Sequence, residues 1–265
     1  MILSLFVIFA LGPIIVLIFN SVKGSAELGR NPLGPPREVI IENYPDAWET
    51  GNFSTTVRNS LIIVTGTVSG VLLFGGMAAY SLAKLKLPRI VPNILIIYLL
   101  VISSLPVQLF LVPLFVLWRT LHLIDNLLGV IIIYIALYSP FSIFLMRAYI
   151  IQIPGDFEDA ARIEGANEWQ VFTKIVVPLS WPVFLSVGLI VSMFAWNEFL
   201  IATVFLTKRE VFTVVTSYFA FSKRFGVDWG LTSAAAVMMI IPIISVFLIF
   251  QRRFIQGLYQ GGIKG

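Results

Sequence analysis

Residues 154–182, PGDFEDAARIEGANEWQVFTKIVVPLSWP, form the one long polar segment that lies between two long apolar segments of this chain. The segment opens with a helix-start signal: Asp156 occupies the N-cap position after a Pro-Gly pair, and Asp159 follows three residues later. Small residues follow, and glycine commonly ends such a helix, so we expect the first helix to stop at Gly165.

A second helix-start signal lies further along the same segment. Asn167 and Gln170 repeat the capping spacing and predict a second helix that continues toward Pro178 and Pro182. We therefore predict that residues 154–182, called the elbow below, form a helix–turn–helix that lies outside the bilayer and docks on a partner.

Composition places the rest of the chain in a membrane. Of the 265 residues, 58% are hydrophobic and only 12% are charged, and the mean hydropathy is +0.94. A soluble chain of this length could not bury so much apolar surface in one core, so lipid must be its solvent. The absence of cysteine excludes disulfides and thiolate metal sites, and the lack of an extended basic cluster argues against nucleic-acid binding.

Six apolar segments approach the ~20 residues that a helix needs to cross a ~30 Å hydrocarbon core. We predict an all-α membrane protein of one domain, residues 1–265, with six transmembrane helices and a coupling loop, residues 154–174, between the fourth and fifth. The predicted spans are residues 2–19, 60–83, 91–118, 127–150, 175–206 and 231–250. A signal peptide is the alternative interpretation of the first span, but this span has no basic start and no small-residue cleavage site after it. Its abrupt start suggests that a cytoplasmic leader precedes it.

Two of the spans carry features that bear on packing and transport. Gly66 and Gly70 are spaced for close helix packing in lipid, and packing inside one subunit is favoured over dimerisation. Pro106 and Pro113 predict a kink in the third span. Gln108, a strongly polar side chain beside that kink, is a candidate for the substrate pathway.

The fifth span is too long for one straight crossing and contains Trp196, Asn197 and Glu198. Their place near the outer interface favours a structural or interfacial role, because a charge costs little there. Aromatic rings and amides also suit the faces and hydroxyls of sugars, so the three residues are candidates for the substrate pathway as well.

The segments outside the spans carry fewer signals. Residues 20–58 are rich in Gly, Pro and Asn and predict an irregular loop with one short helix near residues 46–50. The single histidine, His122, has no partner pattern around it, which favours an interfacial anchor over catalysis or metal binding. The eighteen Lys and Arg residues divide evenly between the two sides of the membrane. Three of them crowd into the short turn 84–89, which favours a cytoplasmic elbow and cytoplasmic termini.

The elbow resembles the EAA loop of permease subunits in binding-protein-dependent ABC importers. The pattern of that family is Glu-Ala-Ala, three further positions, Gly, and then a hydrophobic residue and Pro after a fixed gap. The matching positions are Asp159, Ala160, Ala161, Gly165, Ile175 and Pro178. Asp159 stands where Glu is usual and Glu164 where Asp is usual. Both keep the charge, although the side chain of Asp159 is one methylene shorter.

Four further stretches look like the maltose-type carbohydrate permeases: NYPDAW, AYSLAKLKLP, FAWNEF and the tail QRRFIQGLYQGGIKG. This resemblance implies a type I ABC importer permease fold in the inner membrane, with the first elbow helix seated in a cleft of a cytoplasmic ATPase. Asp159 and Glu164 would meet basic or amide groups there, and the second helix would carry movement rigidly into the fifth span. The tail would add an ATPase contact through Lys264 and Gly265.

The resemblance also implies partners: a second, non-identical permease, two ATPase subunits, an extracytoplasmic solute-binding protein and a di- or oligosaccharide. ATP and Mg²⁺ would be held by the ATPases, and no G-x-x-x-x-G-K-[ST] occurs here, so this chain is predicted to be neither an enzyme nor a holder of cofactors. A secondary transporter or channel is the alternative, as is an importer of a non-sugar solute such as glycerol phosphate. An intramembrane hydrolase would need a Ser/His or metal constellation, which a lone histidine does not supply.

Overall fold

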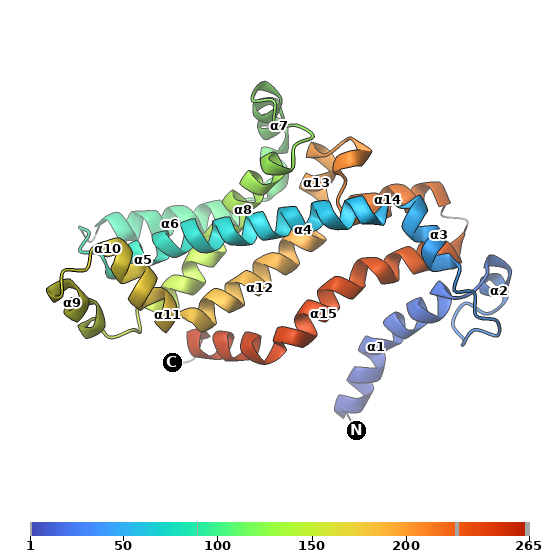
Figure 1. Ribbon diagram of the computed structural model, residues 1–265, viewed down its shortest axis with the longest axis horizontal. Coiled ribbons are helices and arrows are strands. Elements are labelled where there is room, and N and C mark those ends of the chain that lie inside the picture. The colour runs from blue at the N-terminus through green and yellow to red at the C-terminus, as the bar shows by residue number, and fades with distance from the viewer. Residues whose placement is uncertain (1, 89, 226–227, 263–265) are drawn as a thin grey trace. The chain divides into compact units, whose positions relative to one another are not determined.

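The computed structural model describes residues 2–88, 90–225 and 228–262, and every regular element within these ranges is a helix (Figure 1). The chain divides into two compact units, Met1–Leu61 with Glu198–Ser245 and Ile62–Asn197 with Val246–Gly265. Two helices, α4 (Phe53–Gly70) and α15 (Trp229–Gly262), run through both units.

The first unit holds the helix of the first apolar segment, the short helices after it, and the short helices that precede the last apolar segment. They are α1 (Ile2–Ser21), α2 (Ser25–Arg30), α3 (Asn43–Thr50), α13 (Leu200–Phe205), the 3₁₀ helix η4 (Arg209–Val211) and α14 (Val214–Phe225). The short helix predicted near residues 46–50 is confirmed as α3, but the irregular loop predicted for the rest of residues 20–58 is wrong in part, because α2 is helical and α4 already begins at Phe53.

The buried side chain of Lys23 holds this loop together through hydrogen bonds. Its side chain is fully buried, and its ammonium donates hydrogen bonds to Asn20 Oδ1 (3.1 Å) and to the carbonyl oxygens of Asn31 (2.8 Å) and Gly34 (2.6 Å). A lysine ammonium has three donors, and here each has an oxygen partner, which offsets the cost of removing the charge from water. The loop after α2 is thereby tied to the end of α1 by contacts that no local sequence pattern predicts.

The second unit contains the elbow and the helices around it. They are the π-helix η1 (Val71–Gly75), α5 (Gly76–Lys84), α6 (Ile90–Ser104), the 3₁₀ helix η2 (Val107–Phe110), α7 (Leu111–Thr120), α8 (Leu127–Ile150), α9 (Asp156–Ile163), α10 (Glu168–Val171), the π-helix η3 (Phe172–Val176), α11 (Val177–Leu179) and α12 (Trp181–Asn197). The long helix α8 packs against both α5 and α12 (Figure 1). The core they share includes Tyr80, Met146, Phe172 and Phe184.

Three helices of the described residues are long and apolar enough to cross a membrane: Phe53–Lys84, Leu127–Ile150 and Trp229–Gln251. They correspond to the predicted second, fourth and sixth spans, and the fourth has the predicted bounds. The second begins at Phe53 rather than at residue 60. The number of crossings rises to five if each of two bent helix pairs counts as one span, so the predicted total of six remains a prediction.

The predicted third span, residues 91–118, is two helices rather than one. Ile90–Ser104 and Val107–Thr120 meet at 91°. Pro106 has no N–H to offer the carbonyl of Ile102, and it disfavours helical backbone at Leu105, so the helix ends there. Of the two prolines predicted to kink the span, Pro106 lies at the break and Pro113 lies within α7, and the size of the bend was not predicted.

The predicted fifth span, residues 175–206, is also broken. Glu168–Leu179 and Trp181–Asn197 meet at 82°, and a second break follows Asn197. Pro182 cannot donate to the carbonyl of Pro178, which ends the first helix at this point. The second elbow helix therefore does not run straight into the fifth span, and the rigid transmission of movement expected of it stays a prediction.

The glycine pair of α4 packs inside the subunit, as predicted. A Cβ atom added at Gly66 would lie 2.8 Å from Cδ1 of Ile131, and one at Gly70 would collide with Cδ1 of Ile135. Ile131 and Ile135 are one helical turn apart on α8, so the two isoleucines fill the space that the glycines leave.

Candidate functional site

The first elbow helix, α9, ends as the sequence predicts. Gly165 has φ +88°, in the left-handed region, and its N–H bonds to the carbonyl of Arg162 at 3.0 Å. The next N–H, of Ala166, bonds to the carbonyl of Ala161 at 3.0 Å, which completes a Schellman motif. The predicted start is wrong by one residue, because Asp156 is the first helical residue and the carbonyl of Gly155 makes the opening bonds.

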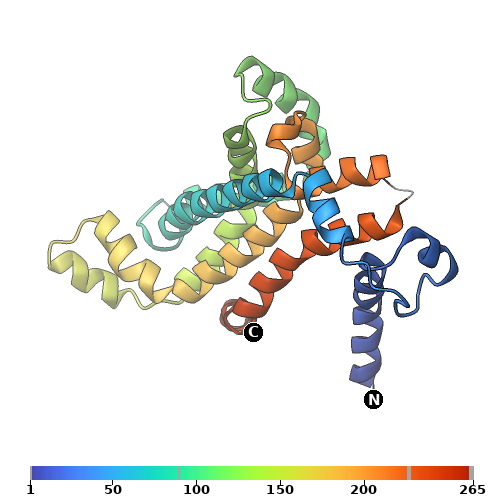
Figure 2. The same cartoon turned by 45° about the vertical axis from the view of Figure 1, so that its right-hand side comes forward.

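The second elbow helix begins with the predicted capping box. Asn167 Oδ1 accepts the N–H of Gln170 at 2.9 Å, and Gln170 Oε1 accepts the N–H of Asn167 at 2.9 Å. The helix continues through η3 and α11 as far as Leu179. Figure 2 shows α9 and α10 as the yellow pair at the left, joined by a short turn.

A buried ion pair fastens α9 to the last residue of α5. Glu158 is 2% exposed, and its Oε1 lies 3.0 Å from Nζ of Lys84, whose side chain is 11% exposed. The Lys84 ammonium also donates to the carbonyl of Ile153 at 2.5 Å, just before the elbow begins. Since an unpaired buried charge is costly, each of the two ions depends on the other.

A second set of contacts joins α9, α10 and α5. Arg162 binds the Glu168 carboxylate with two nitrogens, Nε to Oε1 at 2.9 Å and Nη2 to Oε2 at 3.2 Å. The hydroxyl of Tyr80 donates to Glu168 Oε2 at 2.5 Å and accepts from Arg162 Nη2 at 3.2 Å. The bond to Glu168 raises the pKa of Arg162 further above its ordinary value. We call Tyr80, Lys84, Glu158, Arg162 and Glu168 the clamp.

Part of the exposed surface of α9 is apolar although the segment is rich in polar residues. Ile163 is 88% exposed and Phe157 52%, and Ala160 is exposed between them. Asp159 remains mostly exposed while it pairs with Arg162 at 3.0 Å. Large apolar side chains in water at the end of a helical hairpin are typical of an interface.

Several residues of the EAA pattern come together in a groove between the two elbow helices. This groove has a volume of about 340 Å³, and four of the pattern residues line it: Ala161, Glu164, Gly165 and Ile175. Ala161 also packs partly against the core of the chain, so of the two alanines Ala160 is the more open to a partner. Pro178 is exposed in α11 and does not line the groove.

The clamp was not predicted. The local part of its signal is present in the sequence, because Glu158 and Arg162 are four residues apart and Asp159 and Arg162 three apart on one helix. Lys84 and Tyr80 lie too far away in the sequence for any such spacing to pair them with the elbow. The exposed apolar pair Phe157 and Ile163 could have been recognised as large apolar residues in a polar segment.

A cavity of about 790 Å³ lies between α8 and α12, and we call it the aromatic cavity. It is lined by Tyr138, Phe141, Ile190, Met193, Phe194 and Asn197. The ring of Phe194 is 5.7 Å from that of Tyr138 and 6.3 Å from that of Phe141, centroid to centroid. The amide of Asn197 donates one hydrogen bond to the carbonyl of Met193 at 2.8 Å, which leaves its oxygen and second N–H to serve a ligand.

The other predicted pathway residues do not share this cavity. Trp196 is buried, and Gln108 is exposed in η2 between the bent helices α6 and α7. The Glu198 carboxylate accepts the N–H groups of Ile201 (2.9 Å) and Ala202 (3.0 Å), so it holds the start of α13, which is a structural role. The predicted tail contacts Lys264 and Gly265 lie outside the described residues.

The sequence pattern of the family described as "binding-protein-dependent transport system inner membrane component" matches residues 71–259, which include the elbow, the clamp and the aromatic cavity. The chain belongs to this family. It is thus a multi-pass permease of the inner membrane that works with a binding protein, as the resemblance of the elbow implied.

Two relatives that match this permease over its whole length are named as sugar transport components. It is 34% identical to the arabinooligosaccharides transport system permease protein AraQ of Bacillus subtilis, covering 100% of this chain and 93% of the relative. It is likewise 34% identical to the trehalose transport system permease protein SugB of Mycobacterium tuberculosis, covering 99% and 95%.

A solved structure has the same fold. It is a bacterial ABC transporter involved in the import of the acidic polysaccharide alginate, and one of its chains matches with a TM-score of 0.79 at 27% identity, covering 96% of this permease and 94% of that chain. The all-helical permease fold expected from the sequence is therefore confirmed.

Proposed function

We propose that this permease is one of two non-identical membrane subunits of an ATP-driven importer for a di- or oligosaccharide. It would form half of the path through the membrane, with the elbow and the termini in the cytoplasm. Two ATPase subunits would bind ATP and Mg²⁺ and dock on the elbows of the two permeases, and a solute-binding protein would deliver the sugar outside.

The observation that carries the proposal is the exposed apolar face of α9. A polar segment that presents Phe157 and Ile163 to water while the clamp holds its opposite side gives a rigid docking surface. Glu164 and Gly165 adjoin this face in the groove, where a partner side chain could enter. Asp159 stands at the edge of the face with its carboxylate exposed.

The clamp suggests how force from the ATPases would enter the membrane. Because Lys84 and Tyr80 lie in the last turns of α5, a push on α9 moves the end of the second span together with the elbow. At α12 the elbow meets the fifth span through the 82° bend, so the same push would turn α12 rather than slide it. A transporter that switches between inward- and outward-facing states needs such a mechanical link between the ATPase-binding elbow and the membrane helices.

The sugar assignment rests on the names of the relatives together with the aromatic cavity. Phenyl rings can stack on the apolar face of a pyranose, and an amide such as that of Asn197 can bind its hydroxyls. We propose that this cavity, closed by the second permease, forms part of the sugar path.

The docking surface is tested by Ile163→Asp. A charge on the apolar face is expected to abolish copurification of the ATPase subunits with the permease. Ile41→Asp is the matched control, because Ile41 is also exposed (65%) but precedes α3, on the side predicted to face outward. Equal ATPase recovery from both variants would refute docking through α9.

The sugar path is tested with the complete transporter in liposomes. We expect ATP hydrolysis to be stimulated by the binding protein with at least one carbohydrate of a panel, and Phe194→Ala to slow uptake of that sugar on the order of tenfold, since a ring contact is lost. Phe74→Ala is the control, because Phe74 is exposed in η1 and does not line the cavity. Stimulation by glycerol phosphate and by no carbohydrate would overturn the sugar assignment but leave the importer intact.

A further inference from the structure

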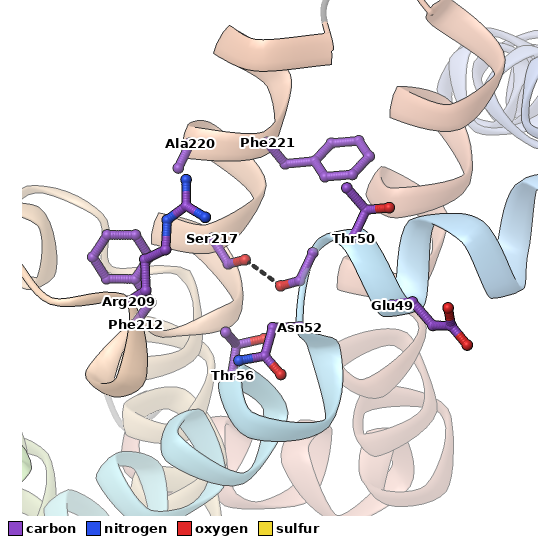
Figure 3. Close-up of a pocket in the computed structure, with 10 residues that line it drawn as sticks. Glu49, Thr50, Asn52, Thr56, Arg209, Phe212, Ser217, Ala220 and Phe221 are labelled. Carbon is purple, nitrogen blue, oxygen red and sulfur yellow. Dashed lines mark hydrogen bonds between the residues drawn. The ribbon is translucent and has the colours of Figure 1, made fainter.

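A second pocket lies wholly within the first unit, where the end of α3 and the start of α4 face η4 and α14 (Figure 3). Its volume is about 290 Å³, at the small end of the ~300–1,000 Å³ that ligand pockets usually span. The size suits a single sugar ring better than a long chain. We call it the polar pocket.

The two walls of the polar pocket are joined by hydrogen bonds between distant parts of the chain. Asn59 Nδ2 donates to the carbonyls of Glu210 (2.9 Å) and Phe212 (3.0 Å), and the N–H of Val214 donates to Ser60 Oγ at 2.9 Å. These bonds hold η4 and the start of α14 against the first turns of α4. The pocket is therefore formed before any ligand arrives, which lowers the entropy cost of binding.

Buried side chains with hydroxyl groups line the middle of the pocket. Ser217 and Thr56 both line it and are both more than nine-tenths buried. Ser217 Oγ donates to the carbonyl of Gly51 at 2.7 Å, drawn as the dashed line in Figure 3. Asn52, between these groups, has φ +49°, a conformation that asparagine tolerates better than most residues, and its amide lies beside Thr56.

The charges around the pocket balance. Arg209 and Glu49 lie on opposite sides of it in Figure 3, and within the described part of the chain neither forms an ion pair. An anionic ligand would meet Glu49 as well as Arg209, so the pair favours a neutral ligand. The phenyl rings of Phe212 and Phe221 add apolar surface beside the polar groups.

We propose that the polar pocket binds one ring of a neutral saccharide. Such a ring combines an apolar face with hydroxyls that both donate and accept, and the pocket offers phenyl rings, hydroxyls, an amide, a guanidinium and a carboxylate to match. The inference rests on the proposed function in one respect: the saccharide is taken to be the imported one. In the proposed orientation the pocket opens on the outer side, where it holds the sugar before it enters the membrane.

The test measures saccharide binding to the complete transporter without ATP or binding protein, by saturation-transfer NMR with trehalose and with an arabinotriose as probes. The wild type should give a signal from at least one probe. Arg209→Ala should weaken binding about tenfold, since a charged hydrogen-bond donor is lost. Ala220→Trp should abolish the pocket signal by filling the space while leaving every polar group in place. Arg58→Ala is the matched control, because Arg58 is exposed on α4 and does not line the pocket.

Equal probe signals from all four proteins, or no signal from the wild type, would overturn the proposal. A third result would also overturn the proposal. If the pocket variants bind the probes as wild type does, but their ATP hydrolysis is stimulated less by both sugar-free and sugar-loaded binding protein, the pocket receives the binding protein instead of a saccharide. A wild-type transporter whose ATP hydrolysis no carbohydrate stimulates would instead overturn the sugar assignment of the proposed function. The binding measurement on the variants does not depend on that stimulation, so the two failures can be told apart.

Discussion

Exchange of Glu158 for Gln is expected to release the elbow from the second span and to uncouple ATP hydrolysis from transport. The change leaves the Lys84 ammonium buried without its counter-ion, and breaking a buried pair in this way costs about 3–5 kcal/mol. If the loss is confined to the elbow, ~3 kcal/mol speeds hydrogen–deuterium exchange of the α9 amides by roughly a hundredfold. Mass spectrometry of peptides that cover residues 156–163 measures this directly.

Two further variants make the result specific to the ion pair. Asp156→Asn removes an exposed carboxylate from the same helix and should leave exchange within the ~0.5 kcal/mol typical of surface substitutions. Glu158→Gln combined with Lys84→Met leaves no unpaired charge and should recover much of the protection. If the α9 amides of the Glu158→Gln single variant exchange hydrogen for deuterium at the wild-type rate, the clamp does not hold the elbow.

Substitution of Gly165 is expected to have the second large effect. The backbone there has φ +88°, and a side chain in that region costs about 1–2 kcal/mol. A Cβ atom at Gly165 would meet nothing within 4 Å in this chain, so any further loss must come from a partner that approaches the open space. We expect Gly165→Ala to lower transport about tenfold and Gly165→Asp to abolish it, while the amount of inserted permease stays unchanged.

A small series separates the backbone from the docking surface. Gly165→Asn should transport nearly as well as wild type if only the backbone matters, because asparagine tolerates this conformation, and poorly if a partner must come close. Gly155→Ala is the matched control, since Gly155 precedes the same helix with φ −64°, which any residue adopts, and an added Cβ there has no neighbour within 4 Å. Normal binding-protein-stimulated ATP hydrolysis in Gly165→Asp would refute the coupling role.

The parts of the structure that depend on neighbouring residues could be predicted. The Asn167–Gln170 capping box, the end of α9 before Gly165 and the span 127–150 all follow from caps, glycine and runs of apolar residues, which act within a few positions. Close packing at Gly66 and Gly70 was predicted on the same grounds, although the partner isoleucines on α8 were not.

The parts that depend on distant contacts could not. Lys23 was an ordinary loop residue in the sequence, and only its contacts with Asn31 and Gly34 show that it organises the loop. Prolines lie where the third and fifth spans break, but the angles of 91° and 82° could not be read from the sequence. The roles expected for Asp159, Glu164 and Pro178 concern a partner protein and stay predictions until one is bound.

The clamp also limits how far the elbow can be treated as a module. Exchange of residues 154–182 between two permeases would carry over Glu158, Arg162 and Glu168 but leave behind Tyr80 and Lys84, which hold them from α5. In such a chimera the charged side chains of the transferred loop would face residues of α5 other than their native partners Tyr80 and Lys84. Grafts meant to redirect a permease to another ATPase should therefore exchange the end of the second span along with the loop.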